Sequence, residues 1–109
     1  MIAHNVYFTL KDNSEAARQS LMDACYKYLS IQPGMVTFYC GVVAADHVRP
    51  VNVRDFDVGL HVVFVDKEAH DTYHNSAEHD RFVEEMSGNW LQSRGFDTVI
   101  AALRATGDS

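Results

Sequence analysis

The sequence has little proline, few basic residues and no long apolar run, and each shortage excludes a class of protein. Two prolines and an apolar fraction of 47% among 109 residues argue against a disordered chain. Nine basic residues against fifteen acidic ones give a net charge of −6, and no basic run is present that would bind nucleic-acid phosphates. No apolar segment has the length of a membrane span. We therefore expect neither a nucleic acid nor a membrane as a partner.

Cysteine is also scarce, and the start of the chain does not resemble a targeting signal. Cys25 and Cys40 lack the CxxC spacing of a redox or metal motif, which predicts two free thiols in a reducing compartment. The opening segment carries a histidine and an asparagine where a signal peptide would be apolar. These features predict a cytoplasmic protein. A chain of 109 residues is long enough to bury one core, so we expect a single domain over residues 1–109.

Hydrophobic periodicity predicts four strands and three helical segments. The expected strands cover residues 2–10, 35–45, 56–65 and 96 to about 103, and the expected helices cover residues 14–30, 67–74 and 76–86. Asp12, followed by Glu15 three residues later, resembles a capping box at the start of the first helix. Asp66 and Ser76 are suitable caps for the other two helices.

A loop is expected around Trp90, because Gly88, Asn89 and Gly95 surround it. When the two consecutive helices of residues 67–74 and 76–86 are counted as one helical unit, the complete order is β-α-β-β-α-β. This order predicts the α+β ferredoxin-like fold, a four-stranded antiparallel sheet with its helices on one side.

The face of this sheet that points away from the helices should be polar, but the pattern makes it apolar as well. The residues expected there include Tyr7, Met35, Tyr39, Val43, Val63 and Val65. A large exposed apolar surface usually marks an interface. We therefore expect a homodimer in which two sheets pack face to face. An irregular, monomeric sheet with scattered apolar residues is the alternative.

Polar residues on apolar faces are the candidates for function. His4 alternates with Ile2, Val6 and Phe8 on the inner face of the first strand. His79 stands with Phe82, Val83 and Met86 at positions i, i+3, i+4 and i+7 of one helix face. Tyr73 ends the preceding helix, six residues before His79. The alternative interpretation is that these are core side chains that hydrogen-bond to one another or to the backbone.

Three segments together resemble the stress-responsive A/B barrel (Dabb) family: His4-x-Val6-x-Phe8 with Lys11, the strand from Asp57 to Phe64, and Tyr73 with His79. The resemblance covers nearly the whole chain and implies a ferredoxin-like subunit that forms a dimeric α+β barrel. It further implies that His4, Tyr73 and His79 are catalytic, as their counterparts are in a polyketide cyclase of that family. The chain departs from the family pattern at Ser76-Ala77-Glu78-His79, where relatives commonly have His-Pro-x-His.

Two main classes of function are compatible with these features. The first is a cofactor-independent cyclase or lyase, or a small-molecule binder, with Val6, Phe8 and Phe82 completing the ligand pocket. Its ligand would be a small apolar carbonyl or aromatic compound, and its chemistry proton abstraction next to a carbonyl. The second is a noncatalytic, stress-associated dimer. A cofactor-free monooxygenase is a weaker, third interpretation.

A metal site is not predicted from the sequence. His70 and His74 are four residues apart, the spacing at which two imidazoles on a helix can share a metal ion. A third ligand at a recognisable spacing is missing, so we interpret this pair as part of a solvated helix face. The expectation is therefore a protein without metal or cofactor.

Overall fold

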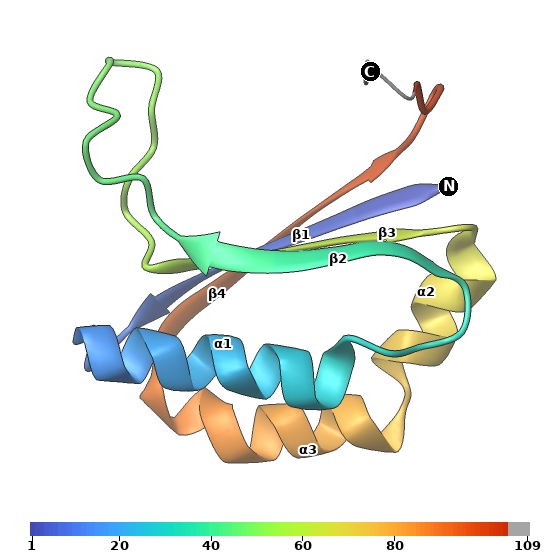
Figure 1. Cartoon of the computed structure of the whole chain (residues 1–109), viewed down its shortest axis with the longest axis horizontal. Coiled ribbons are helices and arrows are strands. Elements are labelled where there is room, and N and C mark those ends of the chain that lie inside the picture. Colours follow the sequence, from blue (N-terminus) through green and yellow to red (C-terminus); the bar gives the residue numbers. More distant parts are fainter. Residues whose placement is uncertain (105–109) are drawn as a thin grey trace, which may run out of the picture.

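The computed structural model describes residues 1–104 and contains a four-stranded antiparallel sheet with helices on one of its faces (Figure 1). The strand order is β2-β3-β1-β4. In chain order the elements are β1 (Ile2–Leu10), α1 (Glu15–Leu29), β2 (Met35–Val42), β3 (Val58–Phe64), α2 (Lys67–His74), α3 (Ala77–Met86), the 3₁₀ turn η1 (Ser87–Asn89) and β4 (Trp90–Val99). The predicted ferredoxin-like α+β fold is thus confirmed.

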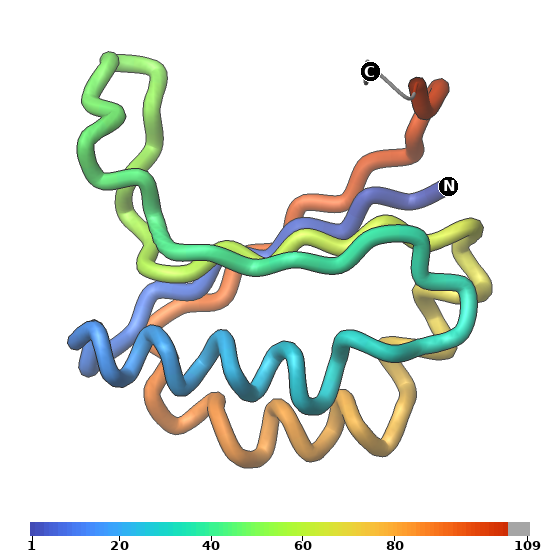
Figure 2. The backbone as a smooth tube through the Cα atoms, viewed as in Figure 1, coloured from blue at the N-terminus to red at the C-terminus, as the bar shows by residue number. Residues whose placement is uncertain are grey.

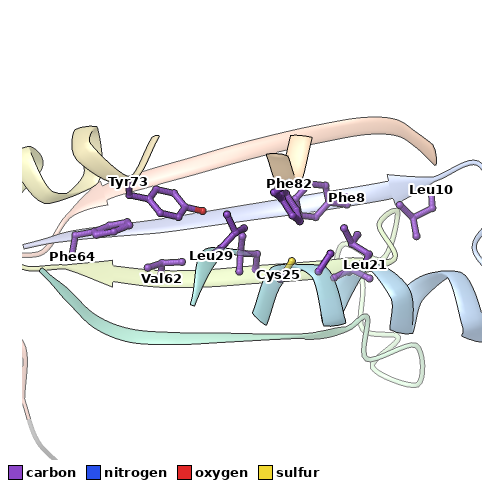
Figure 3. Packing of buried hydrophobic residues seen from close by; sticks show 12 residues of the cluster. Phe8, Leu10, Leu21, Cys25, Leu29, Val62, Phe64, Tyr73 and Phe82 are labelled. Carbon is purple, nitrogen blue, oxygen red and sulfur yellow. The ribbon is translucent and has the colours of Figure 1, made fainter. Parts of the chain in front are cut away.

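The hydrophobic core fills the layer between the sheet and helices α1 and α3 (Figure 1). Figure 3 shows side chains from both layers meeting there, with Phe8 and Leu10 from β1 opposite Leu21, Cys25 and Leu29 from α1. Alternate β3 residues point into the same layer, and Val58, Leu60, Val62 and Phe64 are at most 1% exposed. Burial on this scale contributes about 25 cal/mol per Å² of apolar surface removed from water.

The helix starts match the sequence prediction except at α1. Asp66 and Ser76 cap α2 and α3 by accepting the backbone N–H groups of Ala69 and His79. The cap of α1 is Ser14, which accepts the N–H of Ala17, and the prediction that Asp12 caps this helix is wrong. Asp12 lies two residues before Ser14 and accepts its N–H. Its carboxylate therefore fixes the backbone of the residues that precede the helix.

The last strand differs most from its prediction. Strand β4 begins at Trp90 and ends at Val99, so the expected loop around Trp90 and Gly95 and the expected strand end near Leu103 are both wrong. The turn lies earlier, at η1, where the side chain of Asn89 binds both the N–H and the C=O of Asp12. Gly95 pairs with Val6 inside the ladder. Figure 2 shows the result, with the end of β4 beside the start of β1.

The sheet face away from the helices is uncovered in the monomer, as Figure 1 shows. Tyr7 lies on it in contact with the rings of Phe56, His61 and Phe96, and Tyr39 stacks on His61. The predicted apolar outer face is therefore present, with two adjustments. Met35 packs against the core because the β2–β3 register shifts between Met35 and Thr37. Phe56, which alternates with the inward-facing Val58 and Leu60 in the sequence and would be inside if the strand began there, contacts Tyr7 outside.

The loop of residues 43–57 rises on this uncovered side of the sheet (Figure 1). It carries three well-exposed valines, Val48, Val51 and Val53. Among residues 1–104, none of the helices has both the length and the apolar character needed to cross a membrane.

Candidate functional site

A pocket of about 260 Å³ opens between the inner face of the sheet and helices α2 and α3. The six residues expected to form a site all line it: His4, Val6, Phe8, Tyr73, His79 and Phe82. Leu60, His74, Val83, Trp90, Ser93 and Gly95 complete its wall. The lining is thus mostly apolar, with a small number of polar groups, which is typical of small-molecule pockets.

His4 lies on β1 and forms part of the pocket wall beside α2, where its ring is near those of His70 and Tyr73. Its Nδ1 atom lies 2.6 Å from the Oδ1 atom of Asp97 on β4, directly across the ladder. Burial lowers the pKa of His4, and the Asp97 carboxylate opposes this effect. The imidazole is therefore held neutral near pH 7 and fixed in orientation by a single carboxylate.

Tyr73 lies between the two candidate histidines and is 1% exposed. Its ring is 6.0 Å from that of His4 and 5.2 Å from that of His79, measured between centroids. Figure 3 shows its hydroxyl directed along the sheet toward Phe82 and Phe8. Burial raises the pKa of Tyr73, so its phenol stays protonated and can donate a hydrogen bond.

His79 is placed by the start of α3, where its backbone N–H donates to the Ser76 hydroxyl. Burial, and secondarily the neighbouring His74, lower the pKa of His79. Among residues 1–104, no protein group hydrogen-bonds to its imidazole or to the Tyr73 hydroxyl. The alternative in which these two side chains bond to each other or to a backbone carbonyl is therefore not what the structure shows.

The pair His70 and His74 also belongs to this region. His70 was expected to be solvated, and this prediction is wrong: its side chain is 19% exposed and its ring lies 5.0 Å from the ring of His4. His74 is exposed, as expected, but its ring is 4.9 Å from that of His79. Four of the six histidines in the chain thus lie in one cluster of rings, in which His4 and His79 flank Tyr73.

Sequence reasoning missed three polar or aromatic members of the pocket wall: His74, Trp90 and Ser93. Ser93 pairs with Phe8 across the β1–β4 ladder, so the correct register of β4 would have placed it on the inner face. The indole N–H of Trp90 is buried without a partner among the described residues. A buried donor without a partner is uncommon in proteins and marks a group that a ligand or water would satisfy.

A second depression, of about 510 Å³, lies on the opposite face of the sheet. It is bounded by Asn5, Tyr7, Val53, Phe56, Arg94 and Phe96. Arg94 is paired there with Asp55 at 2.8 Å. This hollow lies in the apolar surface that a second sheet would cover, and it shares no residue with the first pocket.

The model of the stress responsive A/B barrel domain matches residues 2–100 of the chain. No curated protein matches it. Among solved structures, a Dabb family protein with a ferredoxin-like fold from Mesorhizobium loti has a TM-score of 0.75 at 24% sequence identity, covering 93% of this chain and 97% of that one.

Two further structures share the fold at lower identity. A dimeric ferredoxin-like protein of unknown function from Thermobifida fusca has a TM-score of 0.74 at 12% identity, covering 91% of this chain and 90% of its own. A suggested antibiotic biosynthesis monooxygenase from Nitrosomonas europaea has a TM-score of 0.72 at 13% identity, covering 94% of this chain and 100% of its own. At these identities the likeness concerns the fold.

Proposed function

Because the chain belongs to the stress responsive A/B barrel domain family, we propose that it is a homodimer in which each subunit binds a small molecule between its sheet and its helices. The observation that carries this proposal is the pocket of about 260 Å³ with His4, Tyr73 and His79 in its wall. The remaining lining is largely apolar, which suits a small apolar carbonyl or aromatic ligand.

The chemistry that fits this wall is proton transfer without a cofactor, of the cyclase or lyase type. Neutral His79 takes a proton from the carbon next to a bound carbonyl, and the electron pair moves into an enolate. The protonated phenol of Tyr73 donates a hydrogen bond to the enolate oxygen. When the enolate carbon attacks a second carbonyl of the same molecule, the imidazolium returns its proton to the new alkoxide. To His4, the second imidazole of the pocket wall, we assign the stabilisation of that oxygen.

Two electrostatic features support these roles. The lowered pKa of His79 keeps it in the form that accepts a proton at neutral pH. The raised pKa of Tyr73 keeps it in the form that donates a hydrogen bond. Titratable groups with shifted pKa values that share a pocket are a feature of catalytic sites.

The homodimer is supported by the uncovered face of the sheet. Tyr39 and Phe96 are 57% and 54% exposed there, beside the rings of Tyr7 and His61. Exposed aromatic side chains over a whole sheet face are costly in water, and a second copy of the same face would remove them from it. The structure from Thermobifida fusca is itself described as dimeric. We expect the interface to bury about 1,200 Å² or more in total.

Two other functions are distinguishable from this one. The suggested monooxygenase of Nitrosomonas europaea shares the fold, which favours a cofactor-free oxygenase as the second candidate. The third candidate function is that of a noncatalytic, stress-associated dimer that binds no small molecule.

Native mass spectrometry of freshly purified protein, followed by a screen of aromatic and β-dicarbonyl compounds, tests the proposal. A retained or titratable ligand that is turned over without oxygen supports proton transfer. Turnover that consumes oxygen supports the oxygenase. A well-folded dimer that binds no compound in either assay contradicts the ligand-binding proposal.

A further inference from the structure

Three metal-binding side chains meet at the end of the sheet near α2. They are His4 from β1, His70 from α2 and Asp97 from β4, and one ligand atom of each lies within 4.8 Å of the other two. His4 and Asp97 are neighbours across the β1–β4 ladder, and the ring of His70 packs edge-on against that of His4. Of these three residues, only His4 lines the pocket described above.

The hydrogen bond made by His70 leaves its second ring nitrogen available to a metal ion. Nδ1 of His70 lies 3.2 Å from Oδ1 of Asp71, and Oδ2 of the same carboxylate accepts a hydrogen bond from Lys67. A carboxylate on one ring nitrogen fixes the tautomer and leaves the other nitrogen free to bind a metal, and this arrangement recurs behind metal-bound histidines. Asp71 thus lies where a carboxylate would be needed to orient His70 as a metal ligand.

We propose that His4, His70 and Asp97 bind one divalent transition-metal ion in each subunit, with zinc or cobalt as suitable ions. Two imidazoles and one carboxylate form a three-ligand set that leaves a position open for water or another ligand. Magnesium and calcium prefer oxygen ligands and should bind poorly here.

The required adjustment of the side chains is small. With metal–ligand distances of about 2.0–2.2 Å, two ligands of a tetrahedral ion lie roughly 3.3 Å apart. The 2.6 Å contact between His4 and Asp97 must therefore lengthen slightly, and the widest separation, up to 4.8 Å, must shorten. The Asp97 side chain is 51% exposed and can rotate freely, so this movement does not disturb the core.

This site goes beyond the proposed function and does not depend on it. The residues that would handle a carbonyl ligand, Tyr73 and His79, are separate from His70 and Asp97. His4 is common to both, so a bound ion would hold His4 away from proton transfer. Metal binding would then change the protonation of one pocket residue, His4. Loss of metal binding would leave Tyr73 and His79 in place.

Isothermal titration of untagged, chelator-treated protein with zinc chloride tests the site. We expect one zinc ion per subunit, and with cobalt the visible absorption of a low-coordinate complex. His70→Ala and Asp97→Asn should each weaken zinc binding by about tenfold or more. Asp97→Asn changes an exposed side chain and should keep the circular dichroism and melting curve of the parent. His70→Ala removes a ring that is only 19% exposed, so its melting curve is recorded beside the titration. A tenfold excess of magnesium should not compete.

Three control variants separate this site from its alternatives. His47→Ala removes an exposed histidine from the 43–57 loop and should leave zinc binding unchanged. Tyr73→Phe should also leave it unchanged, although it should impair binding of a carbonyl ligand. If His74→Ala abolishes zinc binding and Asp97→Asn does not, the ion is held by the helix pair His70 and His74, and the proposal is wrong. Absence of stoichiometric zinc binding in the parent protein would equally overturn it.

Discussion

Nδ1 of His4 lies 2.6 Å from Oδ1 of Asp97, although the two residues are 93 positions apart in the chain. The contact forms because β1 pairs with β4 and puts these residues opposite each other on the inner face of the sheet. It joins a largely buried imidazole to a half-exposed carboxylate. The candidate pocket therefore has a charged group at its edge that acts directly on one of its histidines.

Removing the charge of Asp97 should lower the pKa of His4 further. Burial lowers this pKa, and Asp97 is the group that opposes it. Asp97→Asn keeps the size of the side chain but takes away that opposition. The prediction is checked by proton NMR titration of the imidazole signals in the presence of a chelator. Asp46→Asn makes the same charge change in the 43–57 loop and should leave the His4 signal where it was. A His4 pKa that rises or stays constant in Asp97→Asn would contradict the assignment.

The free energy of unfolding should fall as the pH is lowered through about 6.5. Burial lowers the pKa values of His4, His61 and His79 below their ordinary value of 6.5. The unfolded chain therefore binds protons at a higher pH than the folded chain, so stability is full above 6.5 and is lost below it. Urea denaturation between pH 5 and 8 measures this. His79→Gln should flatten the dependence, His47→Gln should not, and a stability that is constant over this range would refute the prediction.

A carboxylate on the uncovered face of the sheet should dissociate the dimer. Tyr39 is 57% exposed in the monomer and stacks on His61, on the sheet face that we expect to be covered. In Tyr39→Asp or Val63→Asp, dimerisation would bury a charge without a partner, at a cost of several kcal/mol. Light scattering at micromolar concentration should show a dimer for the parent and a monomer for these variants.

The matched control for this experiment is Ile31→Asp. Ile31 is 90% exposed at the turn between α1 and β2, so the same apolar-to-acidic change lies away from the sheet face. This variant should stay dimeric. A parent protein that is already monomeric, or a Tyr39→Asp variant that stays dimeric, would place the interface elsewhere or exclude it.

Asp57 should be required for stability. Its buried carboxylate accepts the backbone N–H of Leu10 at 2.7 Å and the side-chain amide of Asn13 at 3.3 Å. It thereby ties the end of β1 to the start of β3. Asp57→Ala leaves the buried Leu10 N–H without its acceptor and should cost about 1–3 kcal/mol of unfolding free energy. Asp46→Ala is the control at an exposed carboxylate of the 43–57 loop, and an equal loss in both variants would argue against a special role for Asp57.

Much of the fold could be predicted from local patterns. Alternation along β1 correctly placed His4 with Val6 and Phe8 on the inner face, and the helical period correctly placed His79 with Phe82. These predictions succeeded because each depends only on the geometry of one strand or one helix. The order of elements then defined the ferredoxin-like sheet.

The missed parts depend on contacts between distant segments. Asp97 was not recognised because the register of β4 against β1 is set by the turn at η1, where Asn89 binds Asp12. Gly88 and Gly95 predict a loop by their residue type, although Gly95 lies inside the ladder. His70 was assigned to solvent because α2 has only eight residues, too few for the period to define its inner face. The packing of α2 against β3 decides which of its side chains point inward.

The candidate site is tested most sharply by Tyr73→Phe and His79→Ala. If both side chains act on a bound carbonyl compound, each variant should reduce binding or turnover sharply and keep the parent dimer. Tyr73→Phe removes only a hydroxyl that no described protein group bonds to, so its melting temperature should hardly change. If His79 instead serves only the core, His79→Ala should cost about 1–3 kcal/mol of stability and leave ligand binding intact. Met86→Ala, on the same face of α3 and outside the pocket wall, is the packing control. A thermal melt and a ligand titration on each variant separate the outcomes, and destabilisation without any effect on a ligand would rule out the catalytic roles.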